Sequence, residues 1–355
     1  MPTNFHPYDI CDSDISCMIF QDFQFPVIDQ FGSISWYTSA DIRSGDYCAS
    51  LLASEKLAKL INHTDGPAFL IARSYTGTVL KKATPVGKRF LESQLQNLFI
   101  TTPMDYLPSE AHQVLMKVAK DQNLGLVAFT QNPLATVNHE GLLEADLANS
   151  FVIRVREALE LPSTKNRIET RKKLFHHRSK MIQRNLDRLQ LMTVQPRIVE
   201  IHLDYLGGAK PFSLDDSEAQ IKQFIADIQE SAYLPLWHFW KRQHTSETGY
   251  NYRCLFVFDS LFLDSVQNSI YHIVGLWHQL TDGRGIATWS QDFGADFMAA
   301  SRHAKMMFQR DMILQLKESP ELQHFGIGDP PAITKDLPKT PAVPYEPSGL
   351  ISHLI

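Results

Sequence analysis

The pattern of apolar and polar positions predicts a regular series of strands and helices in the second half of the chain. Strands show period-two alternation, and helices carry apolar residues three and four positions apart. The predicted elements are, in order, a strand at Arg197 to Asp204, a helix at Ser217 to Ser231, strands at Leu234 to Arg242 and at Tyr250 to Asp259, a helix from Val266 to Trp277, a strand at Ile286 to Trp289, and a helix from about Ala295 to Lys317. This βαββαβα order predicts an α+β fold, an antiparallel sheet with helices on one face, close to the split βαβ plan.

Residues 1–150 have a less regular pattern and predict a separate, mixed α/β N-terminal region. Strand-like runs at 33–38, 68–72 and 125–129 alternate with helical stretches near 47–62, 86–98 and 109–122. Pro108 followed by Ser109 predicts a helix start, because a serine hydroxyl can cap the free N–H groups of a first turn. No motif assigns a chemistry to this region, so its role stays open.

The composition is that of a soluble globular protein. Of the 355 residues, 44% are hydrophobic and 21% are charged, which excludes collagen-like and wholly disordered chains. No apolar run approaches the roughly 20 residues that a membrane span needs, and the first 42 residues hold six Asp and no Lys or Arg, unlike a signal or transit peptide. The cysteines, at positions 11, 17, 48 and 254, form no CxxC pair and no zinc spacing. We therefore expect reduced thiols, no contact with a membrane and a cytoplasmic protein.

Positive charge is concentrated in a predicted basic amphipathic helix over residues 151–190. Thr164 to Arg188 holds nine Lys or Arg against two acids, a net charge of +7. The net charge of the whole chain is −5, so the remaining residues together carry −12. Apolar residues recur at helical spacing, which predicts one buried stripe and one basic face. Such a face can follow a phosphate backbone; a solvated helix that links two domains is the alternative. The candidate nucleic-acid-binding residues on it are Arg171, Lys172, Lys173, Arg178, Lys180 and Arg184.

Prolines mark the C-terminal part of the chain. Six of them between positions 330 and 347 predict an extended, polyproline-like tail over residues 329–355, either mobile or docked on a partner. The chain is thus divided into an N-terminal region (1–150), the basic helix (151–190), a sheet domain (191–328) and the Pro-rich tail.

Four segments between residues 150 and 330 have an order and spacing that carry a family resemblance. They are the basic helix that leads into the strand IVEIHLD, the hairpin WKRQHTSETGYNYRCLFVFD, the turn LWHQLTDGRG and the segment RDMILQLKESPELQHFGIGDPP. This part of the chain resembles the inovirus-type replication proteins with a YagK/YfjJ-like C-terminal domain, relatives of the HUH rolling-circle initiators. The resemblance implies an HUH-like fold for residues 191–328 and a DNA-binding protein of a mobile element, phage or prophage-like island.

The resemblance also implies where a nicking site would lie. Family members cut DNA with a tyrosine, helped by a divalent metal that two histidines on one strand and a third polar residue hold. Residues i and i+2 of a strand point to the same face, so both can reach one ion. In this chain the histidine positions fall on Asn251 and Arg253, the third-ligand position on Gln243, and the tyrosine and a lysine three residues on fall on Met306 and Gln309.

These departures imply a catalytically degenerate relative. Arg253 is permanently protonated and has no lone pair for a metal, and the thioether of Met306 cannot form the tyrosine–phosphate link. We therefore expect no catalytic residue and no cofactor. The Arg253 guanidinium could instead hold a DNA phosphate, or it could pair with a nearby acid such as Asp204; both interpretations stay open.

Two further groups of residues are weaker candidates. Glu200, His202 and Asp204 alternate on one strand and could hold a divalent metal if the chain is an active endonuclease; the alternative is a polar sheet face. Five strand aromatics could stack unpaired bases, although their alternation favours a buried face: Trp237, Phe239, Trp240, Tyr250 and Tyr252. The chain has no GxSxG, HExxH or GxGxxG motif that would support a hydrolase, a zinc protease or a dinucleotide-binding protein.

The leading expectation is a DNA-binding protein, related to rolling-circle initiators, that binds single-stranded, hairpin or origin-like DNA without nicking it. One alternative is an active replication endonuclease with unconventional residues, such as the 200–204 cluster with a tyrosine from the N-terminal part. The other is a scaffold that binds proteins through the N-terminal region or the Pro-rich tail and no longer uses the DNA site.

Overall fold

The computed structural model describes residues 10–28, 33–40, 46–75, 77–92, 102–103, 105–126, 130, 132–138, 140–207, 211–231, 235–259, 266–317 and 324–330. They form an α+β protein with two compact units. The sheet unit comprises the described residues of Met1–Ile42, His176–Gln309 and Leu316–Ile355; the helical unit comprises those of Arg43–Phe175 and Arg310–Gln315. Most of the predicted tail, from residue 331 on, lies outside the described residues.

This division differs from the predicted ranges because the N-terminal segment belongs with the sheet. Helix α1 (Asp12–Asp22) and strand β1 (Gln24–Ile28) contact strands β7 (Trp237–Thr245) and β6 (Pro196–Tyr205). Their apolar side chains are buried there, as Ile19 and Phe23 show. The period-two and helical patterns of such a short segment do not reveal which distant sheet it covers.

The sheet unit contains the elements that the pattern predicted from residue 196 onward. After the hairpin of β1 with β2 (Ile34–Thr38) and the C-terminal part of α6 (Pro162–Met192), the order is β6, α7 (Leu214–Glu230), β7, β8 (Gly249–Asp259), α8 (Val266–Leu280), β9 (Gly285–Gly294), α9 (Phe297–Ile313) and β11 (Phe325–Ile327). From β6 to α9 this is the predicted βαββαβα order. The five strands form one antiparallel sheet in the order β11-β7-β8-β6-β9.

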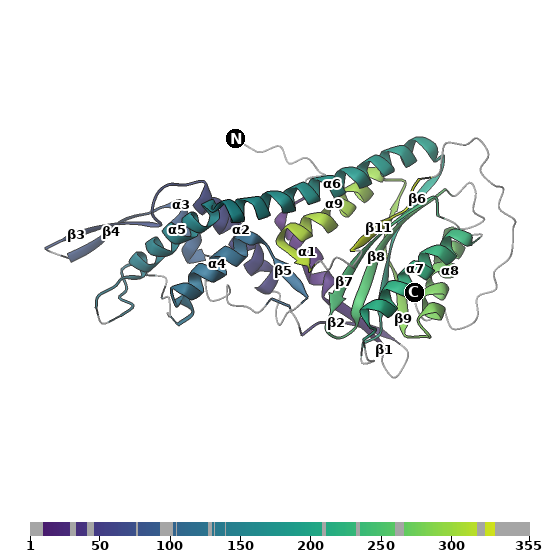
Figure 1. The fold of residues 1–355 in the computed structure, drawn as a ribbon, viewed down its shortest axis with the longest axis horizontal. Helices are drawn as coiled ribbons and strands as arrows, with labels where there is room; N and C mark the ends of the chain where they lie inside the picture. The colour runs from purple at the N-terminus through teal and green to yellow at the C-terminus, as the bar shows by residue number, and fades with distance from the viewer. Residues whose placement is uncertain are drawn as a thin grey trace. The chain divides into compact units, whose positions relative to one another are not determined.

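Helices cover both faces of this sheet, so the prediction of helices on one face is wrong (Figure 1). On one face, alternate residues of β6 and β8, such as Ile201 and Cys254, form an apolar core with α7 and with Trp277 of α8. On the other face, the ring of Phe239 on β7 lies 5.6 Å from that of Phe308 on α9. The central strands are buried on both faces, and α9 supplies the second cover through its own apolar side chains.

The strand aromatics are mostly core residues. Trp237, Phe239, Trp240 and Tyr252 are buried, and Tyr250 is half-buried beside the ring of His244. Four of the five are therefore inaccessible to a base, as the alternation favoured. The core interpretation holds because neighbouring strands and helices cover both sides of β7 and β8.

The helical unit has its own apolar core, built mainly from helices α2, α4 and α5. Its elements are α2 (Asp46–Asn62), β3 (Phe69–Ser74), β4 (Gly77–Ala83), α3 (Pro85–Glu92), β5 (Tyr106–Pro108), α4 (Glu110–Asp121), the 3-10 turn η2 (Leu124–Leu126), α5 (Glu144–Glu160), the start of α6 and β10 (Leu314–Leu316). The Ser109 hydroxyl accepts a hydrogen bond from the backbone N–H of His112, which confirms the predicted cap of α4.

Two local predictions in this unit need correction. Residues 124–126 form a 3-10 turn and not the start of a strand, and residues 127–129 lie outside the described part. The pattern predicted a helix to Lys317, but α9 ends at Ile313. It ends there because the next residues form β10, which pairs with β5. The Ile313 carbonyl accepts from the Ser109 backbone N–H at 2.9 Å, a contact with a segment distant in sequence.

Candidate functional site: a basic helix face and a buried polar cluster

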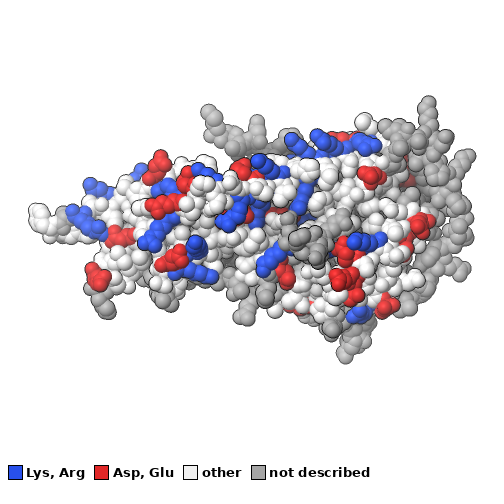
Figure 2. Space-filling view, viewed as in Figure 1, with Lys and Arg blue, Asp and Glu red and all other residues white. Residues whose placement is uncertain are grey.

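The outer face of α6 carries a row of exposed basic residues. Ile182, Leu186 and Leu189 are buried at positions i, i+4 and i+7 of the helix. The opposite side of the helix, by the same spacing, presents exposed side chains, which we call the outer row: Lys173, His177, Lys180, Arg184 and Arg188. Figure 2 shows Lys and Arg side chains along α6 at the upper edge of the view.

No member of the outer row has a carboxylate partner within 4.0 Å in the described part of the chain. The two acids of the helix bind other side chains. Glu169 binds Lys172 at 2.8 Å, and Asp187 accepts a hydrogen bond from Gln183 at 2.7 Å. The lysines and arginines of the row are therefore solvated cations that an external anion can reach.

Three of the six phosphate-binding residues predicted on the helix are not part of this row. Arg171 is buried, and its guanidinium lies 3.1 Å from Glu110 and donates to the carbonyls of Pro108 and Asp311. Its charge is used inside the helical unit, which corrects its assignment to the nucleic-acid-binding set. Lys172 is paired with Glu169. Arg178 is half-buried over the ring of Phe325, 4.9 Å from its centroid.

The sheet face under α9 holds a second group of polar side chains, which we call the inner cluster. Period-two alternation places these residues on the face opposite the apolar core. The cluster brings together residues from α1, three strands and α9: Asp22, Glu200, His202, Gln243, Asn251, Arg253 and His303. It includes the three sheet positions at which the resemblance placed metal ligands.

Arg253 is at the centre of the inner cluster. Its Nε lies 3.0 Å from Oδ1 of Asp22, and its Nη1 lies 3.7 Å from Oε1 of Glu200. These are ion pairs without aligned hydrogen bonds, since neither nitrogen has an aligned acceptor among the described residues. Gln243 also donates to the Asp22 carboxylate. Arg253 is 2% exposed, so its guanidinium cannot reach a DNA phosphate in this structure. The interpretation that it pairs with a nearby acid is confirmed, but the acids are Asp22 and Glu200, and among the described residues no ion pair joins Arg253 to Asp204.

The protonation of the two strand carboxyls differs. Burial tends to raise the pKa of Glu200, but His303 at 2.9 Å and His202 at 3.4 Å outweigh it and hold that pKa well below its usual range. Burial raises the pKa of Asp204 to about 6, and the charges of His202 and Arg253 offset this only in part. Its Oδ2 has no hydrogen-bond partner in the described part of the chain. Glu200 is thus an internal anion, whereas Asp204 is readily neutralised.

The inner cluster does not fit a divalent metal. Among the described residues, no group of three or more His, Cys, Asp and Glu side chains is placed to hold one. Glu200, His202 and Asp204 share a face, but Glu200 already faces the guanidinium of Arg253 and the ring of His303. A metal beside Arg253 would meet a fixed positive charge.

The nucleophile positions lie on α9, which covers the inner cluster. Met306 and Gln309 are half-buried there. His303, one turn before Met306, contacts Glu200. The carbonyl of Met307 accepts a hydrogen bond from Lys241. The two nucleophile positions therefore carry a thioether and an amide, the position one turn earlier carries an imidazole, and none of the three is a tyrosine hydroxyl.

Sequence reasoning missed Asp22 and His303. His303 could have been found from its place one turn before Met306 on the predicted helix, on the side that faces the sheet. Asp22 gave no signal, because it lies in a segment far from the sheet in sequence.

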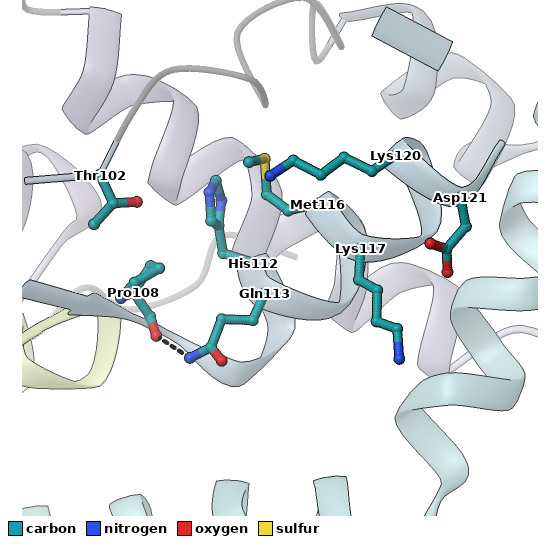
Figure 3. A pocket seen from close by; sticks show the side chains of 8 residues that line it. All are labelled: Thr102, Pro108, His112, Gln113, Met116, Lys117, Lys120 and Asp121. Atoms are coloured by element: carbon teal, nitrogen blue, oxygen red, sulfur yellow. Dashed lines mark hydrogen bonds between the residues drawn. The ribbon is translucent and has the colours of Figure 1, made fainter. Parts of the chain in front are cut away.

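A cavity of about 370 Å³ in the helical unit is a weaker candidate (Figure 3). His112 lines it, with Nδ1 3.1 Å from the Ser54 hydroxyl, and burial lowers its pKa to about 4, so it adds no positive charge at neutral pH. Lys117 and Lys120 diverge from α4 in Figure 3 and do not converge on one anion. We assign no ligand to this cavity.

Comparison of the chain with protein-family models, curated proteins and solved structures gives no significant match. Within the described part of the chain, no helix has the length and apolar character needed to cross a membrane.

Proposed function

We propose that this chain is a nucleic-acid-binding protein that uses the outer row of α6 and is related to rolling-circle replication initiators without their nicking chemistry. The observation that carries the proposal is the row itself. Lys173, Lys180, Arg184 and Arg188 lie on one side of the helix, are exposed, and have no carboxylate partner among the described residues.

A linear row of this kind suits a polyanion better than a small acid. At 1.5 Å per residue, Lys173 to Arg188 spans about 22 Å, so no small ligand can contact all of its members. A nucleic-acid backbone can contact several at once. If about four phosphates are neutralised, the slope of log K against log salt should be about −3 to −4 for duplex DNA.

The sheet supports the relationship to rolling-circle initiators. Its strands β9-β6-β8-β7, linked through α7 and α8, have the order of the split βαβ plan, which fits an HUH-like assignment for residues 191–328. Helix α9 covers the face that carries Asn251 and Arg253, as the family relationship would require of the helix that carries the nucleophile. The buried Arg253 and the methionine at 306 support the loss of nicking. The proposal includes a cytoplasmic location and binding to the DNA of a mobile element.

The first test is a titration of the purified full chain against single-stranded, duplex and hairpin DNA at two salt concentrations. Mn²⁺ is present, and each sample is also run on a denaturing gel. We expect binding that weakens steeply with salt while the DNA stays intact. A cleaved or protein-linked strand would contradict the loss of nicking and favour an active endonuclease. Absence of binding at low salt would overturn the proposal and favour a scaffold.

The second test compares two double variants of α6 with the same change of charge. Lys180→Gln with Arg184→Gln removes two cations of the outer row. The control is Lys165→Gln with Lys172→Gln, two lysines of α6 that already bind Glu160 of α5 and Glu169 of α6. The first variant should bind DNA about tenfold more weakly and with a salt slope smaller by about 1.8, and the control should bind within twofold of the wild type. Equal losses would show that only overall charge matters.

A further inference from the structure

The hairpin of β3 and β4 in the helical unit is firmly held at its base. Phe69 is buried, and the side chain of Asn149 on α5 bonds to both its N–H and its carbonyl, at 2.8 and 2.9 Å. At the end of β4, the hydroxyl of Thr84 donates to the Ala68 carbonyl at 2.8 Å. The base of the hairpin is therefore a fixed part of the unit, and the strands extend away from it (Figure 1).

The far part of the hairpin exposes apolar and aromatic side chains. Tyr75, which follows β3, is fully exposed, and Val79 is 61% exposed. Nearer the base, Leu70 is also exposed. The strands pair Ala72 with Val79, so these side chains belong to a two-stranded ribbon with a defined register. Exposed apolar side chains that lie together on one ribbon are typical of a surface that binds another molecule.

The positive charge of the hairpin indicates the kind of molecule that would bind to it. Residues 69–83 contain Arg73, Lys81 and Lys82 and no acid. Lys81 and Lys82 are exposed and have no carboxylate partner in the described part of the chain. Arg73 binds Asp146 of α5, yet its side chain remains 61% exposed. Figure 2 shows Lys and Arg beside the neutral surface of the hairpin at the left of the view.

We propose that the β3–β4 hairpin is a second nucleic-acid contact, a ribbon that enters a groove of duplex nucleic acid. Lys81 and Lys82 would contact the phosphates that border the groove, and Tyr75 would contact base edges or sugars inside it. A two-stranded ribbon matches the width of the major groove of B-DNA. The ligand class rests on the proposed function, but the site is independent of the outer row of α6.

A protein partner is less well matched to this surface. A stable protein interface buries about 800 Å² on each partner, and the hairpin offers only a few exposed apolar side chains between cations. Positive charge without acids, together with an exposed aromatic ring, matches a phosphate-bordered groove instead.

The test uses the full chain with four variants in the same unit. Lys81→Gln with Lys82→Gln removes the two free cations, and Lys117→Gln with Lys120→Gln on α4 is the control with the same change of charge. Tyr75→Ala removes the ring, and Tyr75→Phe keeps it. We expect the hairpin double variant to bind duplex DNA about tenfold more weakly with a salt slope smaller by about 1.8, and Tyr75→Ala to bind at least about fivefold more weakly because the buried contact of the ring is lost. The control and Tyr75→Phe should bind within twofold of the wild type.

A photo-crosslinking residue at position 75 gives the direct readout. A crosslink to duplex DNA supports the proposal, whereas a crosslink only to a second copy of the chain or to an added protein overturns it. If the hairpin variants bind normally while the α6 variants lose affinity, the hairpin proposal fails and the proposed function stands. If the wild type binds no nucleic acid at low salt, both fail. Thermal unfolding of each variant shows that a loss of binding is not a loss of folding.

Discussion

The Nε of Arg253 on β8 lies 3.0 Å from Oδ1 of Asp22 on α1. Both side chains are 2% exposed, so the N-terminal helix closes over the centre of the sheet and supplies the main counter-charge for the buried guanidinium. Two charges that leave water together are stable only if they remain paired. The position that the family resemblance assigned to a metal ligand therefore serves an internal ion pair that fixes α1 to the sheet.

Asp22→Asn should destabilise the protein strongly, because Arg253 would keep a buried charge without its nearest anion. We expect the free energy of unfolding to fall by about 3 kcal/mol or more, measured by urea denaturation at pH 7. The control is Asp292→Asn, which breaks a surface ion pair with Arg197 whose side chains are 43% (Arg197) and 28% (Asp292) exposed, with an expected loss below about 1 kcal/mol. Equal losses would mean that Asp22 and Arg253 are not paired in the folded protein.

Asp204→Asn should change the pH dependence of stability. Burial raises the pKa of Asp204 from 3.8 to about 6, so between these values the folded protein holds a proton that the unfolded chain has released. The stability of the wild type therefore falls as the pH rises through this window, by up to about 3 kcal/mol. The variant lacks this loss, so its stability relative to the wild type should increase from pH 4 to pH 7. A constant difference across the window would contradict the raised pKa.

Glu200→Gln should show the opposite pH trend. The histidines beside Glu200 hold its pKa well below 4.5, so its ionised form stabilises the fold above pH 4.5, and this contribution disappears as the pH falls through the folded-state pKa. The variant should be less stable than the wild type by about 3 kcal/mol at pH 6, and the difference should shrink below pH 4. Unfolding curves at both pH values check this, and a gap that widens in acid would exclude it.

Arg171 and Lys173 lie two positions apart on α6, but their substitution should have opposite effects: one should lower stability and the other should weaken DNA binding. Arg171→Gln breaks a buried pair with Glu110 and should lower the free energy of unfolding by about 3 kcal/mol without altering the salt slope of DNA binding. Lys173→Gln should leave stability within about 0.5 kcal/mol and reduce the slope by about 0.9. Thermal unfolding and salt-dependent titration of the two variants measure both quantities.

Local pattern predicted much of the fold. The period-two runs at β6 and β8, the helical spacing in α7 and α8, and the cap at Ser109 all give the observed elements, because these signals depend on residues a few positions apart. The end of α9 was misjudged, since Leu314–Leu316 leaves the helix to pair with β5, a partner distant in sequence.

The candidate site was predicted only in part. The exposed cations Lys173, Lys180 and Arg184 follow from helical spacing alone, and the shared face of Gln243, Asn251 and Arg253 follows from strand alternation and pairing. The same spacing could not predict the burial of Arg171, because Glu110, the acid with which it pairs, lies on another helix.

The sequence by itself determined the order of the elements, the α+β class and the row of positive charge on α6. These depend on periodicity, which a chain carries locally. Only the tertiary structure decided that helices cover both faces of the sheet, that α1 belongs to it, and that Asp22 and His303 complete the inner cluster. Whether a charged side chain meets water, a phosphate or an internal partner depends on which distant segments pack around it, and that is settled by packing in three dimensions.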